Sequence, residues 1–245
     1  MEPEIGALFF VLLTLVAFLY ASVGHGGASG YLALMALYSF SPAVMKPTAL
    51  LLNICVSLIA FIQYYKSGQF SWKLFLPLAI ASIPTAFLGG LISLPVSVYK
   101  QILGVVLLVP ATRFLFFPTQ NETSKKEMNW PIALLIGASI GFLSGMIGIG
   151  GGILLSPVLI LLGWADVKQS AAVSSLFIFV NSISGLGGQM QQELHFSPMM
   201  YGMVGVALVG GLAGSYFGAF KFNQRILKII LSTVLFIAAF KLFFV

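Results

Sequence analysis

The residues best suited to chemistry lie in two glycine-rich stretches, FLYASVGHGG at Phe18–Gly27 and FLSGMIGIGG at Phe142–Gly151. Five of the ten positions match without a gap, and three of those five are glycines. Each stretch ends one apolar run and begins a shorter one, and glycine allows close backbone approach and a positive φ. A helix that begins there presents unpaired N–H groups and a positive dipole end, which bind anions. The expected backbone donors are Gly26, Gly27, Ala28, Gly150, Gly151 and Gly152.

A competing explanation of the glycines is close helix packing, for which small residues are common in membranes. Two matched copies, each beside a shortened apolar segment, instead follow the pattern of a transport site. We therefore interpret both stretches as halves of one binding site.

His25 is the histidine of the first glycine-rich stretch, whereas His195 falls in a predicted loop. An imidazole can take up a proton, attract an anion and couple its movement to protons. The alternative is a neutral ring that a backbone carbonyl satisfies. Because ionisable residues inside a membrane are usually functional, we assign His25 to the substrate site.

Polar side chains interrupt two long apolar segments, at Asn53 and Ser57 in the first half and at Ser175 and Asn181 in the second. An amide in hydrocarbon without a partner is costly, so these residues rarely face lipid. They either line the pathway or form hydrogen bonds between helices, and both alternatives stay open. We include all four as candidate substrate-binding residues. Asn53 is expected opposite Ser175, and Ser57 opposite Asn181, across a pseudo-two-fold axis.

Acidic residues are absent from the apolar segments, because all six lie at the N-terminus or in predicted loops. This excludes paired-carboxylate hydrolysis and acidic proton relays inside the membrane, and it favours an anionic over a cationic substrate. The single cysteine, Cys55, permits no intrachain disulfide and indicates no cysteine-based metal site. We expect no enzyme activity, no metal and no cofactor.

The composition requires a membrane environment for these segments. Of the 245 residues, 59% are hydrophobic and 7% are charged, whereas soluble domains carry about 25% charged residues. Several apolar runs approach the length that spans a bilayer. The net charge of +6 comes from cations scattered among the loops, which indicates membrane topology rather than nucleic-acid binding. The sequence therefore predicts an all-α polytopic membrane protein.

The chain divides into an N-terminal repeat at 1–117, a polar linker at 118–131 and a C-terminal repeat at 132–245, which together form one membrane domain. Each repeat contains five apolar segments, with a glycine hairpin first and three further crossings after it. An odd number of crossings inverts the second repeat relative to the first, as in many secondary transporters. The expected segments are 5–23, 30–40, 47–65, 75–94 and 98–117, then 132–147, 153–162, 170–188, 198–220 and 226–245.

Cation placement predicts the orientation of the chain. With the N-terminus outside, eight lysines and arginines fall inside and three fall outside, in agreement with the positive-inside rule. We expect the linker inside, the C-terminus outside and a bacterial inner membrane as the location. The inside set is Lys66, Lys73, Lys125, Lys126, Lys168, Lys221, Arg225 and Lys228, and the outside set is Lys46, Lys100 and Lys241.

The chain resembles the TauE/SafE family of sulfite and organosulfonate permeases. The likeness covers nearly the whole chain and is strongest in GFLSGMIGIGGGILLSPVL at Gly141–Leu159 and AAVSSLFIFVNSISG at Ala171–Gly185. The first copy departs from the family pattern, with His25 where an apolar residue is commoner and Ala28 where a third glycine often sits. The resemblance implies transport of a sulfur-containing anion, with export as the better-known direction.

These observations predict a secondary transporter, an exporter of sulfite or an organosulfonate, that works by alternating access around the two hairpins. The anion is expected near mid-membrane, coupled to protons or sodium, and the partners are this anion and the lipid bilayer, with no nucleic acid. The alternatives are an uptake permease for another small anion and an anion channel.

Overall fold

A computed structural model describes residues 6–38, 40–92, 94–95, 98, 126–191, 198–223, 225–227, 229–230 and 233. All regular secondary structure in these ranges is helical. Five of the described helices are long and apolar enough to cross a membrane. The predicted all-α polytopic membrane protein is thereby confirmed. Nearly all of the expected segment 98–117, most of the linker and most of segment 226–245 lie outside the described residues.

The described helices follow the expected order in both halves. The first half contains α1 (Ala7–Ser22), α2 (Ala28–Leu37), α3 (Pro42–Lys66) and α4 (Trp72–Gly90). The second contains α6 (Trp130–Ile147), α7 (Gly152–Leu161), α8 (Val167–Gln189), α9 (Pro198–Tyr216) and the π-helical turn η1 (Phe217–Lys221).

The start of α3 differs from the prediction, which placed Pro47 in the first turn. The helix begins at Pro42, and Pro47 lies inside it. Proline at the first helical position needs no N–H partner, so Pro42 provides an earlier and equally good start. The expected beginning at Pro47 is therefore wrong by more than a turn.

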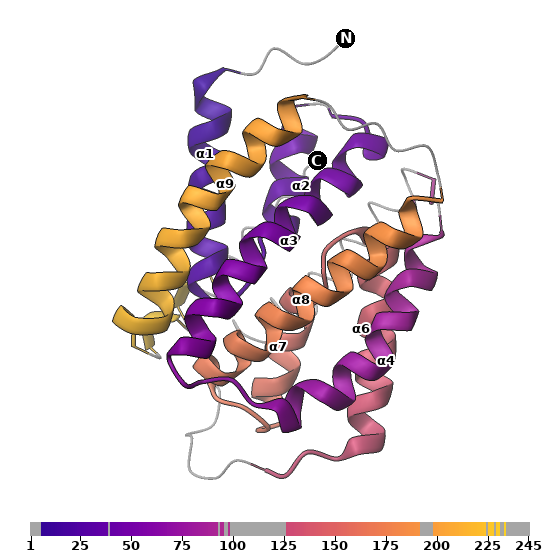
Figure 1. Cartoon of the computed structure of the whole chain (residues 1–245), viewed down its shortest axis with the longest axis vertical. Helices are drawn as coiled ribbons and strands as arrows, with labels where there is room; N and C mark the ends of the chain where they lie inside the picture. Colours follow the sequence, from indigo (N-terminus) through magenta and orange to yellow (C-terminus); the bar gives the residue numbers. More distant parts are fainter. Residues whose placement is uncertain are drawn as a thin grey trace.

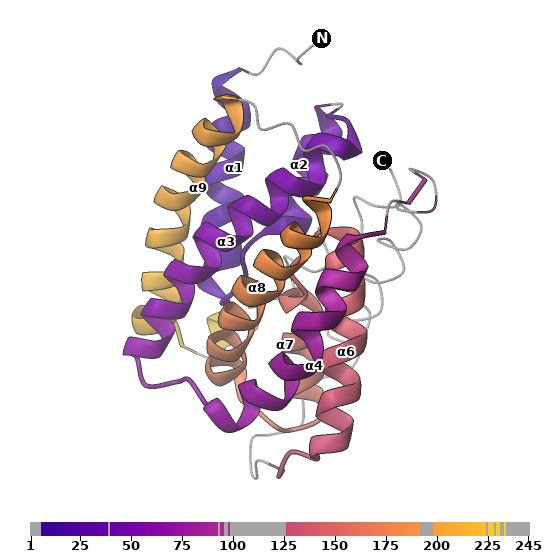
Figure 2. The ribbon, with the colours of Figure 1, turned by 45° about the vertical axis from the view of Figure 1, so that its right-hand side comes forward.

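The two hairpins enter the molecule from opposite ends. Figures 1 and 2 show α1 and α2 in the upper part of the molecule and α6 and α7 in the lower part. The long helices α3 and α8 cross the centre next to each other. Both hairpin tips consequently reach the central region beside α3 and α8.

Contacts between the halves are reciprocal. The first helix of each half packs along the fourth helix of the other, α1 on α9 and α6 on α4. The third helices, α3 and α8, pack on each other, and each also contacts the fourth helix of the opposite half. A pseudo-two-fold axis through the contact of α3 with α8 would generate this pattern. The halves are interlocked rather than placed side by side.

Glycines spaced four residues apart bring the outer helix pairs into backbone contact. A Cβ atom at any of them would lie under 3.0 Å from a main-chain atom of the partner helix. Close packing by small residues is a common way for helices to associate in membranes. On α9 and the adjoining η1 the glycines are Gly210, Gly214 and Gly218, against Thr14, Phe18 and Ser22; on α6 they are Gly137, Gly141 and Gly145, against Leu78, Ser82 and Ala86.

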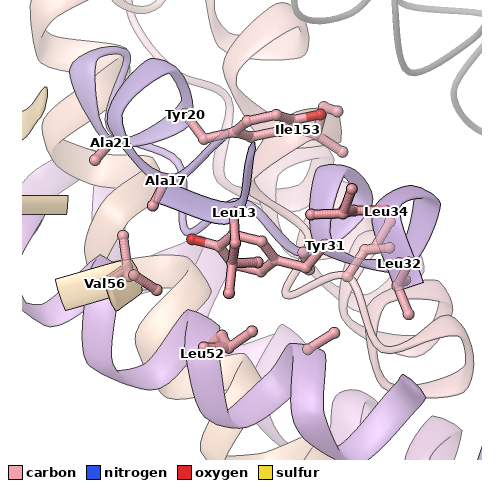
Figure 3. Close-up of a cluster of buried hydrophobic side chains, with 14 of the residues drawn as sticks. Leu13, Ala17, Tyr20, Ala21, Tyr31, Leu32, Leu34, Leu52, Val56 and Ile153 are labelled. Carbon is pink, nitrogen blue, oxygen red and sulfur yellow. The ribbon is translucent and has the colours of Figure 1, made fainter. Parts of the chain in front are cut away.

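A large apolar cluster fills the space around the first hairpin. Figure 3 shows Leu13 of α1, Tyr31 of α2, Leu52 of α3 and Ile153 of α7 turned toward one another. All four side chains are buried. This packing fixes the first hairpin against α3 and brings the start of α7 into the same core.

Candidate functional site

The hairpin tips are built on glycines that adopt left-handed backbone conformations. Gly27 precedes α2 with φ 99°, and Gly151 precedes α7 with φ 82°. Side chains other than glycine rarely adopt these values, so both tips require glycine.

The short helices α2 and α7 begin without a side-chain cap, whereas α8 has one. Asp166 caps α8 by accepting a hydrogen bond from the N–H of Gln169 at 2.9 Å. The residues before α2 and α7, Gly27 and Gly151, provide no side-chain cap. The first N–H groups of these two short helices therefore lack a cap from the preceding residue, and the N–H of Ala28 instead donates to Oδ1 of Asn53 at 3.0 Å.

His25 joins the two hairpins directly. Its Nε2 lies 3.0 Å from the carbonyl oxygen of Gly152, and the side chain is 2% exposed. With Nε2 donating to that carbonyl, Nδ1 is left as an acceptor, and it has no partner among the described residues. The contact with the Gly152 carbonyl agrees with the alternative in which a backbone carbonyl binds a neutral ring. Nδ1, which has no partner among the described residues, remains able to accept a proton.

Asn53 connects both hairpins to the central helices. Its Oδ1 accepts a hydrogen bond from the N–H of Ala28 at 3.0 Å, and its Nδ2 donates to the carbonyl of Ile149 at 3.1 Å. Nδ2 also lies 3.4 Å from the hydroxyl of Ser182 on α8. The polar neighbour of Asn53 on α8 is thus Ser182, whereas Ser175 was expected there.

The other three polar candidates are also fully buried. Ser175 donates to the carbonyl of Ala172 at 2.8 Å, and Nδ2 of Asn181 donates to Phe177 at 2.8 Å, both within α8. Oδ1 of Asn181 and the hydroxyl of Ser57 have no partner among the described residues. Buried polar atoms are normally hydrogen-bonded, so these two atoms require a partner that the described residues do not supply, such as a water molecule or a ligand.

The tip glycines other than Gly27 and Gly151 make room for these side chains. A Cβ at Gly150 would lie 2.6 Å from Nδ2 of Asn53, and one at Gly26 would lie 2.7 Å from its Cγ. A Cβ at Gly152 would lie 2.2 Å from Cδ1 of Ile178 and at an ordinary contact distance of 3.5 Å from Cδ2 of His25. The structure therefore brings His25, Asn53 and the backbone of both tips together in one place.

Sequence reasoning missed Tyr31, and it noted Ser182 as a polar residue of its segment without including it among the candidate substrate-binding residues. The hydroxyl of Tyr31 is buried without a partner among the described residues, and a Cβ at Gly27 would lie 2.7 Å from it. Tyr31 follows Gly27 by one helical turn, a spacing that places both on one face of α2. Ser182 directly follows Asn181 within the same apolar segment. The positions of Tyr31 and Ser182 in the sequence could therefore have indicated both as site residues.

Electrostatics at the tips come from neutral groups and helix ends. Among the described residues, the fully buried polar side chains include no aspartate, glutamate, lysine or arginine. The described part also contains no cluster of histidine, cysteine or acidic residues able to hold a metal. Hydroxyl, imidazole and backbone N–H donors at two helix N-termini suit a small anion.

The fold is that of a multi-pass membrane protein, and the comparisons with known proteins identify it as a membrane transporter. The family model "Sulfite exporter TauE/SafE" matches residues 9–242, and the chain belongs to this family. A probable membrane transporter protein of Sinorhizobium fredii is 39% identical over 241 residues, which cover 96% of this chain and 95% of the relative.

More distant relatives carry the same description. A probable membrane transporter protein of Methanocaldococcus jannaschii is 27% identical over 77% of this chain and 74% of its own length. One of Bacillus subtilis is 25% identical over 93% of this chain and 95% of its own length. No solved structure matches the chain.

Proposed function

We propose that the protein is a secondary transporter that exports a small sulfur-containing anion, such as sulfite or an organosulfonate, by alternating access. The observation that carries the proposal is the meeting of the two hairpins, where Nε2 of His25 lies 3.0 Å from the carbonyl of Gly152. Membership of the TauE/SafE family supports the choice of substrate class.

The anion binds at the junction of the two tips. Backbone N–H groups of Gly26–Ala28 and Gly150–Gly152 supply donors, and the buried hydroxyl of Ser57 supplies another. Because no lysine or arginine is among the fully buried described residues, no fully buried cation of the described part forms a salt bridge with the anion. Binding is therefore modest, which suits a carrier that must also release its substrate.

Coupling to protons uses His25. Its Nδ1, unpartnered among the described residues, can take a proton as the anion enters, and the resulting imidazolium attracts the negative charge. Sodium held by carbonyls and hydroxyls is the alternative coupling ion.

A ligand panel tests the substrate class. Purified full-length protein is heated with sulfite, thiosulfate, sulfate, sulfoacetate, taurine or a neutral amino acid, and the unfolding temperature is measured. Stabilisation by sulfite or sulfoacetate, and not by the amino acid, is expected because a ligand that binds only the native state stabilises it. Stabilisation by the amino acid alone contradicts the proposal.

Counterflow in proteoliposomes then separates a carrier from a channel. In vesicles loaded with unlabelled sulfite, a carrier gives saturable flux and transient accumulation of labelled sulfite above its external concentration, whereas a channel only lets the label equilibrate. The variant Gly150→Val should lose both, because its Cβ enters the space of the Asn53 amide. Gly205→Val is the matched control, since a Cβ at Gly205 meets no atom within 4 Å.

The orientation of the inverted repeats is part of the same proposal. The N-terminus lies outside and the linker inside, as the cation asymmetry supports, and the reciprocal helix packing supports the inversion of one repeat relative to the other. A Glu127→Cys substitution in a Cys55→Ala background should react with an impermeant reagent only after the cells are permeabilised. Reaction in intact cells would place the linker outside and contradict this orientation.

A further inference from the structure

Asn53 uses both ends of one amide to hold the two hairpins. The acceptor end, Oδ1, is occupied by Ala28 of the first hairpin, and the donor end, Nδ2, by Ile149 of the second. The side chain is fully buried in the middle of α3. A single planar group therefore ties together two segments that belong to different halves of the chain.

The acceptor end lies where an anion oxygen would bind. Ala28 is the first residue of α2, and an N–H group at a helix N-terminus is a preferred position for an anionic oxygen. Oδ1 of Asn53 accepts from this group at 3.0 Å. The amide carbonyl thus takes a position that a substrate oxygen also requires.

We propose that Asn53 is a latch which the anion itself releases, an inference that rests on the proposed function. An oxygen of the bound anion replaces Oδ1 at the N–H of Ala28. Because Oδ1 and Nδ2 belong to one planar amide, its rotation also removes Nδ2 from the carbonyl of Ile149. Binding at the first hairpin in this way frees the second hairpin to move.

The exchange is favourable because the anion is the stronger acceptor. Charge-assisted hydrogen bonds are about twice as strong as neutral ones. The remaining link between the tips, from His25 to Gly152, does not involve Asn53. Release of the amide therefore loosens the second hairpin without separating the tips completely.

Asn181 provides a matched control in α8. It is also fully buried, but its Nδ2 donates to Phe177 of its own helix and its Oδ1 has no partner among the described residues. Asn181 therefore bridges no hairpin in this conformation. Substitution of Asn181 should not mimic substitution of Asn53.

Sulfite affinity distinguishes a latch from a direct ligand. In purified full-length protein, Asn53→Leu removes both ends of the amide with little change in volume, and titration calorimetry gives the sulfite Kd. The latch predicts binding about three- to tenfold tighter than in the parent, because no internal hydrogen bond must be broken first. Weaker or unchanged binding in Asn53→Leu, or equal tightening in Asn181→Leu, overturns the latch.

Cysteine accessibility follows the second hairpin and needs no change at Asn53. Ile149→Cys in a Cys55→Ala background keeps the backbone carbonyl that holds Nδ2. Sulfite should increase the alkylation rate of the introduced cysteine by about tenfold, the range that one net hydrogen bond allows. If sulfite binds to this protein and the rate stays constant, the latch is wrong even where Asn53→Leu does not fold.

The absence of sulfite binding would count against the proposed substrate and still leave the latch testable. Without ligand, the cysteine introduced by Ile149→Cys should react faster when Asn53 is replaced by leucine than when it is retained. Equal rates would overturn the latch, whatever the substrate proves to be.

Discussion

The two hairpins share one backbone plan and differ in their side chains. Both place a left-handed glycine, Gly27 or Gly151, directly before a ten-residue helix. At four matched positions the first hairpin has polar residues and the second has mostly apolar ones. The pairs are Tyr20 with Ser144, His25 with Ile149, Ser29 with Ile153, and Tyr31 with Leu155.

Hydrogen bonding follows this difference. In the first hairpin, the hydroxyls of Tyr20 and Ser29 are 2.8 Å apart, and His25 reaches across to Gly152. In the second, the hydroxyl of Ser144 has no partner among the described residues, and Ser156 of α7 donates to the hydroxyl of Ser174 on α8 at 2.8 Å. The repeated part is thus the glycine backbone, whereas His25, the side chain that we propose takes up a proton, belongs to the first hairpin.

The largest effect on transport is expected at the left-handed glycines that both hairpins share. Gly27→Val and Gly151→Val should each lower transport by more than about tenfold, because a β-branched residue at a left-handed position is strained and displaces its neighbours. Sulfite counterflow in proteoliposomes measures the loss, with Gly205→Val as the control. A variant that elutes as a folded protein and transports normally would show that its hairpin does not receive the anion.

A smaller effect, confined to one hairpin, is expected at the histidine. His25→Gln retains a donor toward Gly152 but cannot take up a proton near neutral pH, so transport should slow and lose its pH dependence. Ile149→Gln at the matched position is the control and should leave the pH profile unchanged. A wild-type profile in His25→Gln would mean that another group, or sodium, provides the coupling.

The smallest effect concerns stability. Tyr20→Phe removes the hydrogen bond to Ser29 and should lower the free energy of unfolding by about 1 kcal/mol. Ser144→Ala at the matched position removes a hydroxyl that makes no hydrogen bond to any described residue and should change stability much less. Thermal unfolding in detergent compares the two. Equal losses would contradict the difference between the hairpins.

The sequence predicted features that depend on local chemistry. Short helices after paired glycines follow from backbone rules that act over a few residues, and α2 and α7 were both expected. The burial of Asn53 followed from its polarity within an apolar run. Its partners, Ala28 and Ile149, did not follow, because they lie in segments whose approach depends on the packing of the whole chain.

Two expectations were wrong, the start of α3 and the neighbour of Asn53 on α8. Pro42 and Pro47 are both acceptable helix starts, and the apolar run alone did not distinguish them. The expected opposition of Asn53 and Ser175 rested on a pseudo-two-fold axis, without a residue-by-residue match between the two segments. The contact of Asn53 with Ser182 instead depends on where α3 and α8 pack against each other, which is a property of the whole fold.

The packing of the first helix of each half on the fourth helix of the other half has a consequence for synthesis in the cell. During translation, α1 enters the bilayer long before α9, the helix against which it packs, has been made. Until then, the face of α1 that later contacts Gly210 and Gly214 meets lipid or an insertion factor. Final assembly must therefore wait until α9 has been synthesised, and a ribosome that stops at the linker leaves behind a half whose first helix lacks its partner.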